Sequence, residues 1–372
     1  MQYPRSLAVT WQTTLDRLGA GEIALLRLLA WLAPDPVPMF VLEGDAAEGI
    51  WREAIVLFRQ EIPESQGAAG DLRAALVTLA NYSLLRWDTQ AQTVAVHRVV
   101  QEILRTRLPE EWRRYWLILC LCLVDGASPP DPDVRTWPRW NPLRPHVAFV
   151  VAEADAAGIG EPTAGLMNKL GVLLNIKALH AEAEPLMRRV VDITEKSMGE
   201  GHPNFAAALN NLVQLLHATN RLEEAEPLMR RALEIDERSY GPEHPNVAIR
   251  LNSLAQLLQA TNRLEAAEPL MRRALQIDER IDGPEHPDVA RDLNNLARLL
   301  KATNRLQEAE PLSRRMVGIF LDFTRRTGHP HPRLEAAWAN YAAILKDLGR
   351  SEVEIAAELG ALSGEYGIQL RK

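Results

Sequence analysis

The sequence predicts a mainly all-α protein in which paired helices repeat along the C-terminal part of the chain. Three observations indicate this fold class. His-Pro dipeptides recur every 42 residues, Glu-Pro dipeptides keep the same step, and the apolar residues between them follow the spacing of amphipathic helices. A fixed repeat of this length predicts stacked helical units, each of which covers the apolar face of its neighbour.

Three sets of residues mark the repeat in register. They are His202-Pro203, His244-Pro245 and His286-Pro287; Glu184-Pro185, Glu226-Pro227, Glu268-Pro269 and Glu310-Pro311; and Asn168, Asn210, Asn252 and Asn294. A later His331-Pro332 opens an irregular last unit. The predicted repeats span about residues 162–202, 203–244, 245–286, 287–331 and 332–372.

Each unit is expected to hold two helices. In one unit these are Pro203–Ala218 and about Leu222–Ser239, and Ala225 and Ala232 are among the predicted buried residues of the second. Asn220 lies between the two helices and can adopt the left-handed conformation that ends a helix. The prolines of Gly241–Pro245 then separate one unit from the next.

The pattern Leu-Asn-Asn-Leu, Glu-Ala-Glu-Pro-Leu, Arg-Arg-Ala-Leu, Ile-Asp-Glu and Gly-Pro-Glu-His-Pro resembles the 42-residue tetratricopeptide repeat of kinesin light chains over about residues 162–372. The resemblance implies an α-α superhelix whose first helices line a concave groove. We expect the whole solenoid to span 143–372, with a helix at Leu143–Ala157 covering its first face. The implied function is to bind a protein or peptide ligand in the groove.

Mapping onto that family places polar residues of the first helices inside the groove. The expected groove residues are Asn168, Asn210, Asn252, Asn294, Gln214, Gln256, Arg298, His217, Gln259 and Lys301, joined by Asn175, Lys346 and Arg291. The asparagine amides can donate to and accept from a peptide backbone. The alternative is that these amides brace the neighbouring helix, and both roles can coexist.

Charge along the expected groove changes from neutral to basic towards the C-terminus, where Arg298 and Lys301 lie. An acidic tail or the C-terminus of a polypeptide would suit that end, although solvated surface charge is the simpler explanation of any single lysine. The histidines of the His-Pro steps stand one per unit, too far apart to share a metal ion, so we expect no metal site there.

The first 108 residues show no repeat, yet eight of the nine tryptophans lie before residue 141. The pattern predicts helices at Trp11–Leu18, Glu22–Ala33, Asp71–Ala80 and Val99–Leu108, and strand-like runs at Tyr82–Trp87 and Gln92–Val96. Helices followed by a hairpin and another helix are the order of a winged-helix domain, which we place at 1–108. A helix and a proline-rich linker are expected at 109–142.

The runs Thr10–Leu18, Leu25–Asp35, Leu79–Leu85 and Val96–Gln101 resemble the winged-helix part of NB-ARC proteins of the STAND class of signalling ATPases. In that family the histidine matching His97 reaches a nucleotide phosphate; a purely structural role is the alternative. Arg98 departs from the Asp usual after this histidine. The sequence holds no Gly-x-x-x-x-Gly-Lys-(Ser/Thr), so a nucleotide-binding lobe would have to be supplied upstream or by a second polypeptide.

Composition sets further limits. The net charge is −7, and residues 74–85 are poor in Lys and Arg, so we expect no nucleic-acid partner. The longest apolar run is too short for a membrane span, residues 1–10 do not resemble a signal peptide, and Cys120 and Cys122 are expected to be buried reduced thiols in a cytoplasmic protein.

Catalytic and cofactor motifs are not found, so we predict no enzyme activity and no cofactor. Two functions stay open at this point. One is a sensor that relays a ligand signal to an ATPase lobe, and the other is a stand-alone adaptor without a nucleotide switch.

Overall fold

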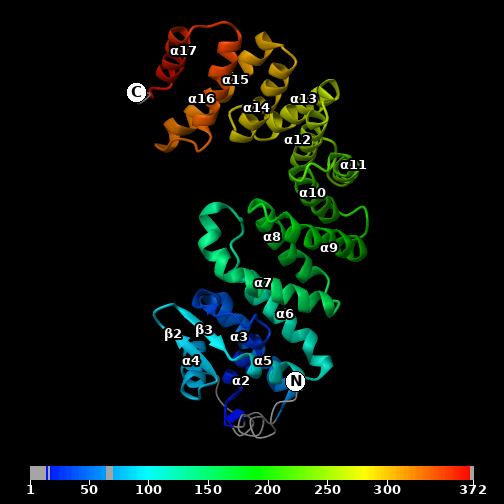
Figure 1. The fold of residues 1–372 in the computed structure, drawn as a ribbon, viewed down its shortest axis with the longest axis vertical. Coiled ribbons are helices and arrows are strands. Elements are labelled where there is room, and N and C mark those ends of the chain that lie inside the picture. The colour runs from blue at the N-terminus through cyan, green and yellow to red at the C-terminus, as the bar shows by residue number, and fades with distance from the viewer. Residues whose placement is uncertain (1–13, 16, 64–69, 369–372) are drawn as a thin grey trace. The chain divides into compact units, whose positions relative to one another are not determined.

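The computed structural model describes residues 14–15, 17–63 and 70–368. These residues are mainly helical with one small sheet, which confirms the predicted fold class (Figure 1). The chain divides into two compact units, Met1–Gly199 and Glu200–Lys372. The first helical pair of the repeat thus groups with the N-terminal unit. Much of the helix predicted at Trp11–Leu18 lies outside the described residues.

The first unit contains eight described helices from α2 onward and three strands. The helices are α2 (Ala20–Ala30), α3 (Asp45–Glu61), α4 (Leu72–Asn81), α5 (Arg98–Arg107), α6 (Glu110–Ala127), α7 (Trp137–Ala156), α8 (Glu161–Ile176) and α9 (His180–Met198). The strands are β1 (Val37–Pro38), β2 (Leu85–Asp88) and β3 (Thr93–Val96), and two short 3-10 helices are η1 (Met39–Val41) and η2 (Val134–Thr136).

The sheet has one strand more than the sequence predicted. The hairpin of β2 and β3 is present, but β1 also pairs with β3, which gives the antiparallel order β1-β3-β2. Pro38 can occupy this strand because β1 lies at the edge, where a missing N–H costs no ladder bond. The sequence pattern also missed α3, whose buried face carries Trp51, Ile55 and Phe58.

The linker before α7 is shorter in the structure than the sequence predicted, because α7 begins at Trp137 rather than near Leu143. Pro138 lies in the first turn, where a missing N–H is tolerated, but Pro142 and Pro145 lie inside the helix. The buried stripe of α7, which includes Trp140 and Leu143, offsets the cost of these prolines by packing.

The two cysteines lie on opposite sides of α6. Cys120 is fully buried and its thiol contacts the carbonyl oxygen of Leu28 at 3.1 Å, whereas Cys122 is exposed. The prediction that both are buried is therefore wrong for Cys122. A spacing of two residues turns a side chain about 200° around a helix, so one apolar face cannot cover both.

The second unit consists of stacked antiparallel helices of 14 to 22 residues. They are α10 (Pro203–Ala218), α11 (Leu222–Tyr240), α12 (Pro245–Ala260), α13 (Leu264–Ile281), α14 (Pro287–Ala302), α15 (Leu306–Thr327), α16 (Leu334–Asp347) and α17 (Glu352–Glu365). Asn220, Asn262 and Asn304 have φ of 58° between the helices of each pair, as their position in the repeat predicted. Gly349 takes this place in the last pair with φ of 85°.

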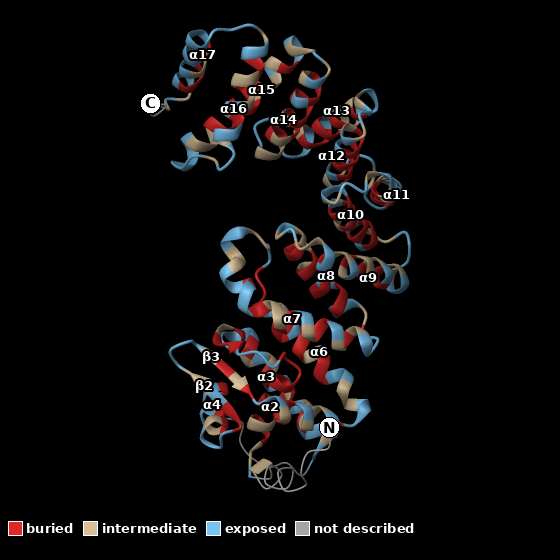
Figure 2. Cartoon of the chain, in the orientation of Figure 1, coloured by how far each residue is buried: buried red, intermediate tan, exposed pale blue. Residues whose placement is uncertain are grey.

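The core follows the facing sides of the paired helices (Figure 2). Small residues lie where the helices meet: Ala225, Ala232, Ala267 and Ala274 are completely buried. Their short side chains let neighbouring helices approach closely, while Met229 and Met271 fill the remaining space.

Ion pairs connect each repeat to the one before it. Arg263, at the start of α13, donates to Glu226 of α11, and Arg305, at the start of α15, donates to Glu268 of α13 at 2.6 Å. A second set links Arg273 to Glu237 at 2.6 Å and Arg315 to Glu279. Each of these ion pairs recurs 42 residues later between the next two repeats.

Candidate functional site

In the second unit, the helices α10, α12 and α14 each begin at a His-Pro step. The Nδ1 atoms of His202, His244 and His286 accept hydrogen bonds from the backbone N–H two residues later, at 3.1, 3.2 and 3.3 Å. The histidines therefore act as N-caps, and the following prolines need no hydrogen bond at the first helical position. This fixes where α10, α12 and α14 begin.

His286 also lies near two carboxylates. Potential ligand atoms of Asp282, His286 and Asp288 lie within 4.8 Å of one another. Nδ1 of His286 already caps α14, and Asp288 accepts from Arg291 at 3.0 Å. Nδ1 of His286 and Oδ1 of Asp288 are thus already engaged in helix capping and in an ion pair.

Polar side chains join the first helices of consecutive repeats. Between α10 and α12, Gln214 donates to the hydroxyl of Ser253 at 3.4 Å, and Ser253 in turn contacts Oδ1 of Asn210 at 3.5 Å. Between α14 and α16, Nδ2 of Asn340 donates to Oδ1 of Asn294 at 2.8 Å. Asn210 and Asn294 thus each contact the first helix of the following pair, and the bond of Asn294 is the shorter one.

Asn252 occupies the same position in α12 but is only 5% exposed. Its Nδ2 donates to Oδ1 of Asp292 in α14 at 2.7 Å. This contact is the bracing role that the sequence left open as an alternative for the asparagines. Asn252 is therefore held by its neighbouring repeat, whereas Asn210 and Asn294 are partly exposed.

The remaining expected groove residues of the second unit differ in exposure. Gln214, His217, Gln256 and Arg298 are exposed, and Gln259 and Lys301 are partly exposed. In the first unit, Asn168 is partly exposed and has a polar partner, and Oδ1 of Asn175 lies 3.0 Å from Nδ1 of His180.

A cavity of about 610 Å³ lies between α14, α15 and α16. Its polar lining includes Asn294, Arg298, Lys301, Asn340 and Asp347, and Ala297 and Ile344 contribute apolar surface. The structure thus brings together three of the expected groove residues in one concavity. Asn340 and Asp347 were not among those expected, since α16 departs from the strict repeat.

Charge in this cavity is less basic than the sequence suggested. Lys301 pairs with Asp347 at 2.8 Å, and Arg291 turns away to contact Asp278, Asp288 and Asp292. Within the described residues, Arg298 has no hydrogen bond or ion pair. Of the four cations expected along the groove, Lys301 and Arg291 are therefore paired with acids, whereas Arg298 and the exposed Lys346 have no ion pair among the described residues.

Two buried acids near the groove were not expected. Asp278 in α13 is 3% exposed and Asp292 in α14 is fully buried. Burial, followed by the charge of Asp292, raises the pKa of Asp278 to about 7, and burial also raises the pKa of Asp292. The sequence carried one signal for this: the position that holds Arg250 in one repeat holds Asp292 in the next.

In the first unit, His97 lies at the junction of β3 and α5, as expected. It is exposed, and its Nδ1 accepts from the backbone N–H of Val99 at 3.2 Å, which makes it the N-cap of α5. Gln101 on the next turn is buried and donates to the carbonyl oxygen atoms of Leu29 and Leu32. The junction that holds His97 is thus fixed to α2.

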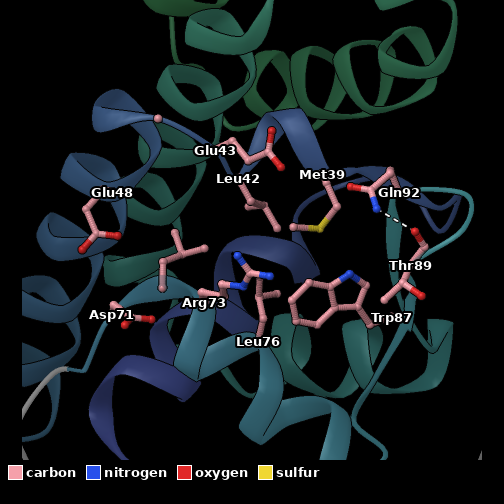
Figure 3. A pocket seen from close by; sticks show the side chains of 12 residues that line it. Met39, Leu42, Glu43, Glu48, Asp71, Arg73, Leu76, Trp87, Thr89 and Gln92 are labelled. Atoms are coloured by element: carbon pink, nitrogen blue, oxygen red, sulfur yellow. Dashed lines mark hydrogen bonds between the residues drawn. The ribbon is translucent and has the colours of Figure 1, made fainter.

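A separate cavity of about 470 Å³ lies beside the hairpin (Figure 3). Met39 and Trp87 face each other across it, and Arg73 of α4 reaches towards them from the helix start (Figure 3). Glu43, Glu48 and Asp71 give its rim an acidic character. His97 does not line this cavity.

A third cavity, of about 820 Å³, lies between α7, α8 and α9 of the first unit. Its lining is mainly apolar, with Val151, Leu170 and Leu174 among the contributing side chains. Two ion pairs, Arg144–Glu182 at 2.8 Å and Arg189–Asp155 at 2.8 Å, cross between α7 and α9 at its rim.

Comparison with known proteins identifies the repeats. A sequence model described as tetratricopeptide repeat matches residues 162–238, 204–280 and 263–322, and one described as a domain of unknown function (DUF7779) matches residues 13–113. No curated protein matches the chain. In the described part, no helix is both long and apolar enough to cross a membrane.

Several solved structures are similar. A putative kinesin light chain from Podosopora anserina with nearly identical TPR-like repeats shares 23% identity, with a TM-score of 0.46 over 54% of this chain and 93% of the other. BtubC from P. vanneervenii shares 20%, with a TM-score of 0.47 over 67% and 93%. The apo form of RapI shares 14%, with a TM-score of 0.48 over 87% and 85%. The match to the sequence model identifies residues 162–322 as tetratricopeptide repeats, which form a protein–protein interaction module.

Proposed function

We propose that the second unit binds an extended peptide segment carrying an acidic group, with its anchor in the cavity between α14 and α16. The observation that carries this proposal is Arg298, an exposed guanidinium without a partner among the described residues, on the wall of a 610 Å³ cavity. A guanidinium binds carboxylates through paired charge-assisted hydrogen bonds. An acidic side group or the C-terminal carboxylate of a polypeptide is the matching ligand group.

The amides beside Arg298 support recognition of a peptide backbone. Nδ2 of Asn340 and Oδ1 of Asn294 bond each other, which leaves a carbonyl oxygen on Asn340 and an N–H pair on Asn294 for a ligand. A peptide unit presents the complementary N–H and C=O groups. Asn210, Gln214, Gln256, His217 and Gln259 would extend the contact along the groove, whereas Asn252 contributes by holding α14 in place.

Peptide arrays read by direct binding, followed by titration calorimetry of the best peptide, test this proposal. Arg298→Gln is expected to weaken binding of an acidic peptide at least tenfold. Arg238→Gln is the matched control, because Arg238 is exposed and pairs with Glu234 on its own helix. Equal affinities of the Arg298 variant and the wild type for every bound peptide would contradict the proposal.

For the whole chain we propose a cytoplasmic sensor of the STAND type, in which residues 1–108 are a winged-helix domain working with an ATPase lobe. The order α2, β1, α3, α4, β2, β3 supports this, since helices followed by a hairpin that pairs with an earlier strand are typical of winged-helix domains. We keep 109–142 as the connection and 143–372 as the solenoid. His97, exposed at the start of α5, would contact the nucleotide phosphate.

The alternative is an adaptor without a nucleotide switch. Binding of this chain to an ATPase lobe distinguishes the sensor from the adaptor. The decisive reagent is a P-loop-bearing segment encoded upstream of this sequence or in an adjacent gene. Tight binding of that lobe, with nucleotide release accelerated by His97→Ala and unchanged by the neighbouring Arg98→Ala, supports the sensor. A lobe that neither binds nor responds to the His97 variant leaves the adaptor.

A further inference from the structure

The interface between α13 and α14 around Asp278 and Asp292, called the α13–α14 joint below, contains more buried acidic than basic side chains. Arg291 is the cation that contacts it: Nη2 lies 3.0 Å from Oδ2 of Asp278, and Nε lies 3.2 Å from Oδ1 of Asp292. Nη1 of the same guanidinium binds Asp288 at 3.0 Å. One positive charge therefore faces three carboxyl groups, two of which are buried.

The preceding joint, between α11 and α12, provides the comparison within the same molecule. Asp236 and Arg250 stand 42 positions before Asp278 and Asp292, and Nε of Arg250 donates to Oδ2 of Asp236 at 2.9 Å. That joint pairs one acid with one base. In the next repeat an acid replaces the base, and the arginine moves to position 291.

Among the residues that the structure describes, no second lysine or arginine contacts the acid pair. From α12, Asn252 donates to Oδ1 of Asp292; directly after α13, Asp282 adds negative charge near Asp278. In the connecting loop, His286 lies 3.9 Å from Asp282 and 3.5 Å from Asp288. Within the same described part, no N–H or hydroxyl group donates to the buried Oδ2 of Asp292.

The two carboxyl groups lie side by side, because Nη2 and Nε of the same guanidinium, that of Arg291, reach Oδ2 of Asp278 and Oδ1 of Asp292. Two carboxylates in this position would repel, whereas a carboxyl and a carboxylate form a short hydrogen bond. We infer that Asp278 and Asp292 share one proton, which Asp278 donates to Asp292, and that loss of this proton loosens the joint between α13 and α14. The joint is thus a pH-sensitive element of the second unit.

The direction of the pH effect follows from linkage. The pKa of Asp278 in the folded chain is raised to about 7 by burial and by Asp292, above the value of roughly 3.9 for an unfolded aspartate. A group whose pKa is higher in the folded chain than in the unfolded chain stabilises the fold fully at a pH below its unfolded pKa. This stabilisation is lost as the pH rises through its folded pKa. Opening of the joint should increase between about pH 4 and pH 7 and then level off.

This inference does not depend on the proposed ligand, because it concerns the unliganded protein. Hydrogen–deuterium exchange of the full chain, corrected for the intrinsic pH dependence of exchange, measures opening in each helix separately. Peptides from α13 and α14 are expected to show opening that rises by up to about tenfold per pH unit between pH 5 and 7. Peptides from α11 and α12 should show a shallower dependence, because Arg250 balances Asp236.

Two variants complete the test. Asp278→Asn supplies a permanent N–H donor to Asp292, so the pH dependence of α13 and α14 should disappear. Arg291→Ile with Asp292→Arg transfers the Ile249-Arg250 pair of the preceding repeat and should reproduce the behaviour of α11 and α12. A wild-type protein whose α13–α14 joint opens equally at pH 5 and pH 8 overturns the inference, even if a variant fails to fold. Persistence of the wild-type slope in Asp278→Asn also overturns it.

Discussion

Asn252 of α12 donates a hydrogen bond of 2.7 Å to Asp292 of α14, so a residue of one repeat holds a buried acid of the next. The two residues belong to the first helices of consecutive pairs, whose polar sides line the candidate groove. The asparagine that the repeat pattern placed among the ligand contacts therefore has a structural partner. This relationship leads to the first prediction.

Asn252→Ala should destabilise the second unit by about 1–3 kcal/mol, because it leaves a buried carboxyl group without its amide donor. The loss should appear in denaturant unfolding and as increased hydrogen exchange in α12 and α14. Asn210→Ala is the control, since its contacts are long and partly exposed, and it should cost less than about 0.5 kcal/mol. Equal effects of the two substitutions would contradict the bracing role.

Glu226 should stabilise the repeat stack through its carboxylate. Hydrogen bonds from Arg263 and Arg230 lower its pKa to about 2, below the usual value for glutamate. A lowered folded pKa gives stability that is present above about pH 4.5 and lost as pH falls towards 2. Glu226→Gln should cost about 1 kcal/mol at pH 7 and little at pH 2 in urea titrations.

Glu234 supplies the matched control for that experiment. It forms an exposed ion pair with Arg238 on its own helix, so Glu234→Gln should change the free energy of unfolding by less than about 0.5 kcal/mol at either pH. An effect of Glu226→Gln that persists undiminished at pH 2 would exclude the ion pair as its cause.

The N-cap role of the histidines predicts that one substitution is tolerated better than another. His244→Ala removes the acceptor for the N–H of Asn246 and should cost about 1 kcal/mol, with fraying at the start of α12. His244→Asn restores a side-chain acceptor and should recover most of the loss. Circular dichroism during thermal unfolding compares the two variants, and similar losses in both would show that capping is not the function of His244.

Asn262 predicts a contrast based on backbone conformation. Its φ of 58° lies in the left-handed region, so Asn262→Gly should be nearly neutral while Asn262→Val should cost on the order of 1–2 kcal/mol. Thermal unfolding of both variants measures the difference. A valine variant as stable as the glycine variant would mean that the turn can take another conformation.

The repeat made much of the second unit predictable. Identical spacing of Pro203 and Pro245 fixes where first helices begin, and Asn220 fixes where they end, so α10 was placed at its observed bounds. The first unit lacks such repetition. There α3 and β1 were missed, and α7 was started too late, because packing of Trp140 and Leu143 outweighs the prolines inside that helix.

The candidate site was predictable only in part. Register placed Asn294, Arg298 and Lys301 on one helix face, and the structure brings all three to one cavity. Their charges were not predictable, because pairing of Lys301 with Asp347 and the turn of Arg291 towards Asp278 depend on side chains from neighbouring helices. Helical periodicity describes one helix and carries no information about its partners.

The ion pairs between repeats have a consequence for how this array can change in length. Each internal 42-residue block carries a glutamate for the block that follows and an arginine for the block before, as Glu226–Arg263 and Glu268–Arg305 show. Duplication or deletion of a whole block would leave every such pair matched. The block that contains Asp292 differs, because its acid faces Asp278 of the preceding block, whereas the equivalent position in its own block is Phe320, so a duplicated copy would lack the second acid.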